Sequence, residues 1–250
     1  MPNDTEEPHL PLTMPPGGRE AVCAVVPCYN AGDRVRPVVE ELLALVDRVI
    51  VVDDGSTDGS GASTGELGAE TIVLPVNQGK GHALLRGFRA ALRHDAMQCV
   101  AVVDSDGQHD PRELPGLYAR MVGDGADLVI GSRTFGQAQV PWHNALGNRL
   151  TSVLTSAMLG RRIPDTQSGF RLHSRRLVES IVQSLPGGRY ETEMEILVKA
   201  VREGYRVSSS PIQTIYEMGN PSSHFDKLHD SWRIYKTLFR AVRDHRRGVD

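Results

Sequence analysis

The sequence of 250 residues lacks most features that mark secreted, membrane-spanning or nucleic-acid-binding proteins. Its three cysteines form neither an even disulfide framework nor a metal-binding spacing. It has no run of 18 or more apolar residues, and its acidic, proline-rich first twenty residues lack the apolar segment of a signal peptide. The formal net charge of −3 gives no support for nucleic-acid binding. We therefore expect a protein of a reducing, cytoplasmic compartment.

What the sequence does contain is a regular alternation of short apolar runs with helix-like segments, beginning at residue 21. The expected strands are residues 21–26, 49–52, 71–74, 99–103 and 127–130, and the expected helices are residues 33–46, 58–67, 80–94 and 112–122. Asp110 and Pro111 predict where the last of these helices begins. Apolar strands that alternate with helices predict an α/β fold, with a mostly parallel sheet covered on both faces.

The pattern changes after residue 140. The sequence here predicts a polar loop at residues 165–171. It predicts helices at 144–159, 174–185 and 191–203, and strands at 205–209 and 212–216. Pro211 separates the two expected strands, because proline cannot donate to a sheet.

The C-terminal residues predict an amphipathic helix. Its apolar stripe recurs at steps of three and four residues, and consists of Phe225, Leu228, Trp232, Tyr235, Phe239 and Val242. Seven Lys and Arg residues against four Asp residues give residues 224–250 a charge of +3. Such a helix suits a membrane surface, but it also suits packing against the domain or a second subunit. We expect three parts: a disordered tail at 1–20, a domain at 21–220 and this helix at 221–250.

Two carboxylates follow the apolar run that ends at Val103. Asp104 and Asp106 are two residues apart, a spacing that places them on one face of a strand or lets a loop bring both onto one ion. Neighbouring carboxylates repel one another unless a positive charge lies between them, and Mg²⁺ or Mn²⁺ prefers such oxygen ligands. Asp, Ser and Gly are also common turn residues, so this segment indicates either a metal site or an acidic turn.

Polar residues follow all five of the first expected strands. In a parallel sheet, ligands bind beyond the carboxyl ends of the strands, so these segments predict a binding site along one rim. They are Pro27-Cys28-Tyr29-Asn30, Asp53-Asp54-Gly55-Ser56, Asn77-Gln78-Gly79-Lys80-Gly81, Asp104-Ser105-Asp106 and Gly131-Ser132-Arg133.

These rim segments, together with Asp165-Thr166-Gln167-Ser168-Gly169-Phe170-Arg171, carry a resemblance over roughly residues 21–217. The chain resembles the family 2 glycosyltransferases of the GT-A fold, and among them is similar to the dolichyl- and polyprenyl-phosphate mannose or glucose synthases. The resemblance implies a Rossmann-like sheet, Mg²⁺ or Mn²⁺ as the cofactor, and a GDP- or UDP-hexose as the ligand. In one place the chain departs from the family, because Ala31 stands where an acidic residue is often found.

Carried over by position, the resemblance also implies roles for individual residues. The nucleotide-sugar-binding residues would be Pro27, Tyr29, Val52, Asp54, Lys80, Asp104, Ser105, Asp106, Gln108 and Arg133. The metal ligands would be Asp104, Asp106 and Gln108, and the catalytic residues Asp106, Arg133 and Arg171, with both arginines facing phosphate oxygens. Asp54 could instead be a turn carboxylate, and either arginine could instead pair with a carboxylate.

The activity that this resemblance implies is inverting transfer of a hexose from a nucleoside diphosphate sugar to a polyprenyl phosphate. One alternative is transfer to the hydroxyl group of a soluble glycan or small molecule, which requires a general base: Glu193 first, then Glu191 or Glu195. The other is a non-catalytic nucleotide-sugar-binding protein. A lipid acceptor implies a peripheral position on the cytoplasmic membrane face. We expect no nucleic-acid partner, and a homo-oligomer is a further possibility.

Overall fold

The computed structural model describes residues 13–133, 156, 165–189 and 191–213. Its centre is a seven-stranded sheet in the order β3-β2-β1-β4-β6-β5-β7. The strands are β1 (Val22–Cys28), β2 (Arg48–Asp53), β3 (Glu70–Val73), β4 (Cys99–Val102), β5 (Leu128–Arg133), β6 (Arg171–Ser174) and β7 (Val207–Ile212). Among these strands only β6 is antiparallel to its neighbours, β4 and β5. The carboxyl ends of β1, β2, β4 and β5 therefore meet at one rim, as the sequence predicts.

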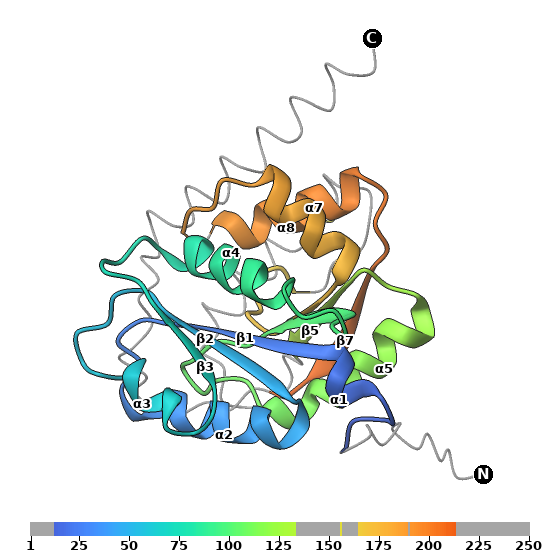
Figure 1. The fold of residues 1–250 in the computed structure, drawn as a ribbon. Helices are drawn as coiled ribbons and strands as arrows, with labels where there is room; N and C mark the ends of the chain where they lie inside the picture. Colours follow the sequence, from blue (N-terminus) through green and yellow to red (C-terminus); the bar gives the residue numbers. More distant parts are fainter. Residues whose placement is uncertain (1–12, 134–155, 157–164, 190, 214–250) are drawn as a thin grey trace.

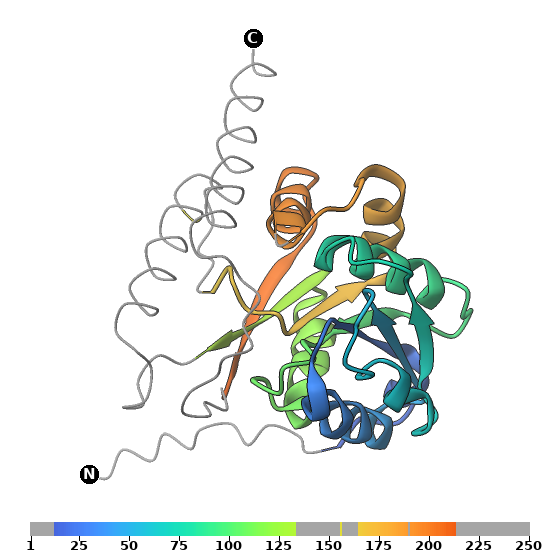
Figure 2. The ribbon, with the colours of Figure 1, turned by 90° about the vertical axis from the view of Figure 1, so that its left-hand side faces the viewer.

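Helices cover both faces of the sheet (Figure 1). They are α1 (Gly18–Ala21), α2 (Val35–Leu45), α3 (Ala62–Gly65), α4 (Lys80–Ala91), α5 (Leu114–Asp124), α7 (Arg175–Ser184) and α8 (Glu191–Arg202), with 3₁₀ turns η1 (Gly32–Arg34) and η2 (Pro111–Glu113). Helices α4, α7 and α8 lie over one face, and α2, α3 and α5 lie over the other. Figure 2 shows the same separation from the side. The predicted α/β fold with a mostly parallel sheet is thereby confirmed.

The central strands β1, β2 and β4 are almost entirely apolar because each contributes to two hydrophobic cores. In β1, Cys23 and Val25 belong to the cluster under α4, α7 and α8, whereas Val22, Ala24 and Val26 belong to the opposite cluster. Successive side chains of a strand point to opposite faces, so a strand covered on both faces must be apolar at every position.

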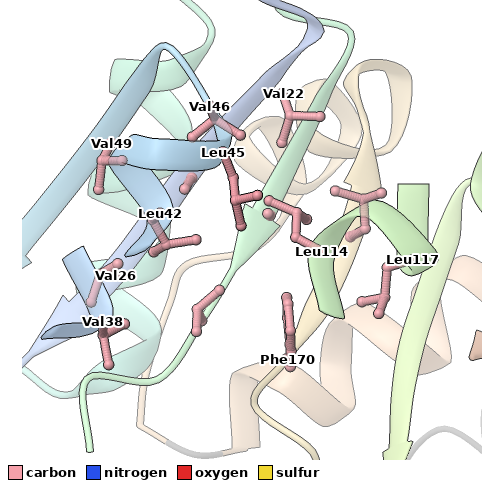
Figure 3. Close-up of a cluster of buried hydrophobic side chains, with 14 of the residues drawn as sticks. Val22, Val26, Val38, Leu42, Leu45, Val46, Val49, Leu114, Leu117 and Phe170 are labelled. Atoms are coloured by element: carbon pink, nitrogen blue, oxygen red, sulfur yellow. The ribbon is translucent and has the colours of Figure 1, made fainter. Parts of the chain in front are cut away.

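The second of these clusters joins α2 and α5 over one face of the sheet (Figure 3). Leu42 of α2, Leu114 and Leu117 of α5, and Phe170 are all fully buried there. Phe170 belongs to the expected polar loop 165–171 and directly precedes β6, so this core anchors the loop that reaches the rim.

Three predicted elements differ from the observed ones. Within the described residues, the expected strands 205–209 and 212–216 correspond to one strand, β7, which runs through Pro211, and residues 214–216 lie outside the described residues. The proline is tolerated because β7 pairs only with β5 among the described strands and lies at the edge of the sheet. The end of the expected polar loop and the residues after it form the antiparallel strand β6, which the sequence pattern did not predict, and the helix expected over 58–67 is shortened to α3.

The shortening of that helix has a local cause. The Asp58 carboxylate accepts bonds from the Ser60 backbone, the Ser60 hydroxyl and the Gly32 N–H, at 3.0, 2.6 and 2.8 Å. These bonds fix residues 58–60 in a turn that competes with helix formation. By contrast, Asp110 accepts from Arg112 N at 3.0 Å and Pro111 follows it, so the predicted helix start is confirmed, with η2 as its first turn.

Near the beginning of the described residues, one short helix replaces the end of the expected tail. Residues Gly18–Ala21 form α1, and Arg19 donates to Asp47 and to the Ala44 carbonyl at the end of α2. The predicted helices at 144–159 and 221–250, and most of the predicted tail, lie outside the described residues. Among the described helices, none is long and apolar enough to cross a membrane.

Glycine 87 tests the contact of α4 with the sheet. A Cβ at Gly87 would lie 2.4 Å from Val25 Cγ1, whereas a Cβ at Gly123, exposed on α5, would meet nothing within 4 Å. We expect Gly87→Ala to lower the free energy of unfolding by about 1–3 kcal/mol through overpacking. Gly123→Ala should raise it by about 0.5–1 kcal/mol by restricting the unfolded chain. Urea denaturation measures both, and equal effects would contradict this packing.

Candidate active site

The rim is organised by one buried ammonium group. Lys80 Nζ lies 2.7 Å from Asp104 Oδ1 and 2.9 Å from Glu193 Oε2. Lys80 is the first residue of α4, Asp104 follows β4, and Glu193 belongs to the first turn of α8. Burial alone would lower the pKa of Lys80, but the two carboxylates raise it well above its usual value. The ammonium therefore stays charged and links three elements.

The loop before α4 delivers Lys80 to this position. The Asp54 carboxylate, almost fully buried after β2, accepts from Gln78 N at 2.8 Å and from Gly79 N at 2.7 Å. Gly79 has φ +104, a conformation that other residues rarely adopt. Asp54 thus fixes the main chain directly before Lys80. Its predicted contact with a nucleotide base stays a prediction.

The two predicted metal-binding carboxylates lie in opposite electrostatic situations. Burial would raise the pKa of Asp104, but the Lys80 ammonium holds it below the usual range. Burial, together with the charge of Asp104, raises the pKa of Asp106, although Asp106 Oδ1 accepts from Gln108 N at 3.0 Å. One carboxylate is thus compensated by a cation, and the other is only weakly compensated.

A charge count explains this difference. Asp104, Asp106 and Glu193 carry three negative charges, against the two positive charges of Lys80 and Arg171, whose Nε lies 4.0 Å from Glu193 Oε1. In these contacts the carboxylates outnumber the cations by one, although the charge of Arg34 also acts on Asp106. Carboxylate oxygens are ligands that suit a hard divalent cation. Among the described residues, no group of three His, Cys, Asp or Glu side chains could hold a metal alone. The other oxygens around a cation held by Asp104 and Asp106 would therefore come from water or from a bound ligand.

Gly169 makes room for this carboxylate pair. A Cβ at Gly169 would lie 1.9 Å from Asp104 Oδ2, so a larger residue there would displace the Asp104 side chain. Gly169 belongs to the polar loop that precedes β6, and β6 pairs with β4. The antiparallel strand thus places the loop directly against the carboxylate.

The two predicted catalytic arginines make contacts within the protein. Arg171 is 1 % exposed and donates to the main-chain carbonyls of Ser168, Glu193 and Thr166, each at 2.9 Å. Arg133 forms a two-pronged pair with the buried Asp165, with Nε and Nη2 at 2.7 and 3.1 Å from the carboxylate oxygens. The alternative of a carboxylate partner thus describes Arg133. Arg171 also lies near a carboxylate, with its Nε 4.0 Å from Glu193 Oε1, and its carbonyl bonds tie the 165–171 loop to α8. A role for either arginine toward phosphate stays a prediction.

The predicted nucleotide side of the rim is built by β1 and β2. Pro27 and Val52 are register partners on these strands, and both are buried. The Val52 side chain belongs to the core under α4, which leaves its main chain as the part that could face a ligand. Tyr29, directly after β1, is half-buried.

Ser105 and Gln108 are half-buried in the turn after β4. Gln108 contributes its main-chain N–H to Asp106, and the structure places its backbone beside the carboxylate pair. Its predicted role as a metal ligand through its side chain stays a prediction.

Sequence reasoning assigned Glu193 only a conditional role and gave Gly169 none. The sequence signal for Gly169 is its position two residues before Arg171 in the polar loop. Glu193 was one of three alternating glutamates, and only the packing of α8 against α4 shows which of them reaches Lys80. Arg34 in η1 was also missed, although its charge lowers the pKa of Asp106.

Fold and site together define an α/β protein with a carboxylate-bearing site at the carboxyl ends of its strands. Residues 23–182 match the sequence model described as Glycosyl transferase family 2. The chain belongs to this family and is a glycosyltransferase, so the resemblance seen in the sequence is confirmed.

Curated relatives extend the similarity over the whole chain. The chain is 29% identical to the polyprenol monophosphomannose synthase of Mycolicibacterium smegmatis, over 96% of this chain and 94% of that protein. It is 29% identical to the UDP-N-acetylglucosamine–dolichyl-phosphate N-acetylglucosaminyltransferase of Methanococcus voltae, over 77% and 84%. It is also 29% identical to the undecaprenyl-phosphate mannosyltransferase of Micrococcus luteus, over 76% and 82%.

Solved structures confirm the expected GT-A fold. The glucosyl-3-phosphoglycerate synthase from Mycobacterium tuberculosis, in complex with Mn²⁺, UDP and glucosyl-3-phosphoglycerate, has a TM-score of 0.69 and 24% identity, over 89% of this chain and 80% of that one. The mannosyl-3-phosphoglycerate synthase from Rubrobacter xylanophilus has a TM-score of 0.65 and 22% identity, over 91% and 74%. At this level of identity the likeness concerns the fold.

The contacts of Arg171 predict a scaffold role. Arg171→Lys keeps the charge but loses at least two of three bonds from a buried cation to main-chain carbonyls, so we expect the free energy of unfolding to fall by about 2–4 kcal/mol. Arg133→Lys keeps a cation opposite Asp165 and should have less than half that effect. Chemical denaturation of both variants measures the difference, and a stable Arg171→Lys protein would argue against the scaffold role.

Histidine 109 predicts a pH dependence of stability. Burial lowers the pKa of His109 from 6.5 to about 4, with Asp104 opposing and Arg133 supporting the shift. Between these pH values His109 takes up a proton in the unfolded chain but stays neutral in the folded chain. The free energy of unfolding therefore falls as the pH drops from 6.5 to about 4, by about 3 kcal/mol in total. We expect His109→Gln to flatten this decline in urea titrations at pH 7.5, 6 and 5. An unchanged pH slope would show that His109 does not carry it.

Proposed function

We propose that this glycosyltransferase transfers a hexosyl group, with inversion, from a GDP- or UDP-hexose to a polyprenyl phosphate in a reaction that requires Mg²⁺ or Mn²⁺. The observation that carries the proposal is the cluster after β4, beside the Lys80 ammonium, where burial and the neighbouring Asp104 charge raise the pKa of Asp106, so that this carboxylate pair would gain from a cation between its members. The full-length similarity to a polyprenol monophosphomannose synthase supports the choice of acceptor.

The metal site would use Asp104 and Asp106, with Gln108 beside them. The donor set fits a hard divalent cation, since it offers carboxylate oxygens and leaves coordination positions for diphosphate oxygens. When bound, the cation would act as a Lewis acid that neutralises charge developing on the leaving diphosphate. The Asp104 carboxylate is held in place for this by the close approach of Gly169.

The chain's own residues would position the donor. Pro27, Tyr29 and the main chain of Val52 would line the nucleotide, at the ends of β1 and β2. Asp54 would hold the loop that carries Lys80, and Lys80 with Ser105 would lie beside the diphosphate. Arg133, fixed by Asp165, would present its guanidinium at the same rim.

The state of Glu193 supports a phosphate acceptor. A phosphate is already anionic near neutral pH, since its second pKa is about 6, and needs no general base. Glu193 Oε2 lies 2.9 Å from the Lys80 ammonium, so this oxygen already has a cation as its partner. Transfer to a hydroxyl group remains the second candidate, because Glu193 Oε1 is buried without a hydrogen-bond partner.

A lipid acceptor would require the protein to work at a membrane surface. We propose a cytoplasmic protein that binds peripherally to the membrane, with the basic C-terminal segment as its contact and a second copy of the chain as the other candidate partner of that segment.

Radiolabelled GDP- and UDP-hexoses with Mg²⁺ or Mn²⁺, assayed with and without undecaprenyl or dolichyl phosphate, test this function. We expect label that extracts into organic solvent only when the lipid phosphate is present, and that disappears with EDTA. Label found only in water-soluble products would instead support the hydroxyl acceptor.

Substitution of the carboxylate pair tests the site itself. Asp106→Asn should reduce turnover by at least about 100-fold, since it removes a ligand charge from the developing transition state. Asp95→Asn, at an exposed turn after α4, is the matched control and should leave turnover unchanged. Full activity of Asp106→Asn would remove the proposed metal site.

A further inference from the structure

Lys80 forms an ion pair with Asp104 Oδ1, a carboxylate oxygen that the proposed metal site needs. Its ammonium lies 2.7 Å from Asp104 Oδ1, and the side chains are only 13% and 26% exposed. An ammonium and a divalent cation compete for the same carboxylate, because each is stabilised by its negative charge. Metal binding must therefore weaken the Lys80–Asp104 contact.

A buried ammonium that loses its carboxylate would be costly, by about 3–5 kcal/mol when no other partner exists. Glu193 supplies that partner, since its Oε2 already lies 2.9 Å from Lys80 Nζ and the side chain is 12% exposed. Lys80 can therefore give up Asp104 while it stays paired. Glu193 is close to Lys80 only because helix α8 packs against helix α4.

We propose that Lys80 is an internal counter-ion, which neutralises Asp104 in the metal-free protein and passes to Glu193 when a divalent cation binds. Glu193 then sets the metal affinity of the site through Lys80, without being a metal ligand. Both are positioning residues in this scheme. The inference rests on the proposed metal site at Asp104 and Asp106.

Mn²⁺ binding to the full chain, measured from the electron paramagnetic resonance signal of unbound Mn²⁺ without nucleotide, tests this. Lys80→Met removes the competitor, so we expect Mn²⁺ to bind about tenfold more tightly. Glu193→Gln removes one of the two carboxylates that contact the ammonium, so we expect Lys80 to hold Asp104 more firmly and Mn²⁺ to bind about tenfold more weakly. Lys199→Met is the matched control: this lysine pairs with Glu203 on α8 and should leave the affinity unchanged.

A double-mutant cycle separates this coupling from simple loss of charge. If Glu193 acts through Lys80, Glu193→Gln should change Mn²⁺ affinity less than about twofold in the Lys80→Met background. If Glu193 acts only through the direct attraction of its charge for Mn²⁺, Glu193→Gln would change Mn²⁺ affinity equally with and without Lys80. Equal effects would overturn the proposal.

The outcomes also distinguish this inference from the proposed metal site. If the unaltered protein binds no Mn²⁺, or if Asp106→Asn binds it equally well, the metal site fails and the inference fails with it. If Mn²⁺ binds and Lys80→Met does not tighten its binding, only the counter-ion role fails.

Lys80→Gln serves as a second variant, and circular dichroism checks the folding of both Lys80 variants. Should neither Lys80 variant fold, unchanged Mn²⁺ affinity in Glu193→Gln overturns the proposal.

Discussion

The ion pairs of Lys80 are the constraint on which the rest of the site depends. One ammonium holds Asp104, which follows the central strand β4, against Glu193 at the start of α8. Two residues determine the position of Lys80. Asp54 accepts hydrogen bonds from the N–H groups of the two residues before Lys80, and Gly79 has the backbone conformation that leads the chain into α4. A buried carboxylate directly after β2 thereby helps to place the positive charge beside the end of β4.

Hydrogen bonds between loops also stabilise the predicted nucleotide-binding part of the rim. Asn30 Oδ1 accepts from Thr57 N at 2.8 Å, and Ser56 Oγ accepts from Asn30 N at 3.0 Å, so the loops after β1 and β2 hold each other. Asn30 adopts φ 47, a conformation that asparagine tolerates better than most residues. Such cross-links preorganise a rim before any ligand arrives, which lowers the entropy lost on binding.

Local patterns predicted the strands β1 to β5, because apolar runs bounded by turn residues are a strong signal when both faces are buried. They failed at β6 and β7, where the decisive facts are tertiary: an antiparallel strand inserted between β4 and β5, and a proline tolerated at an edge. Asp104 and Asp106 could be found from their position after a strand. The contacts of Arg171 could not, since its three carbonyl partners come together only when α8 packs beside the loop.

The pairing of Arg133 with Asp165 has a consequence for the sheet itself. Arg133 ends β5, and Asp165 stands shortly before β6, the neighbouring strand. The carboxylate is fully buried, and the guanidinium is 16% exposed. The ion pair therefore fastens the ends of two antiparallel strands from outside their hydrogen-bond ladder, so the register of β5 and β6 is held by a charge contact as well as by main-chain bonds.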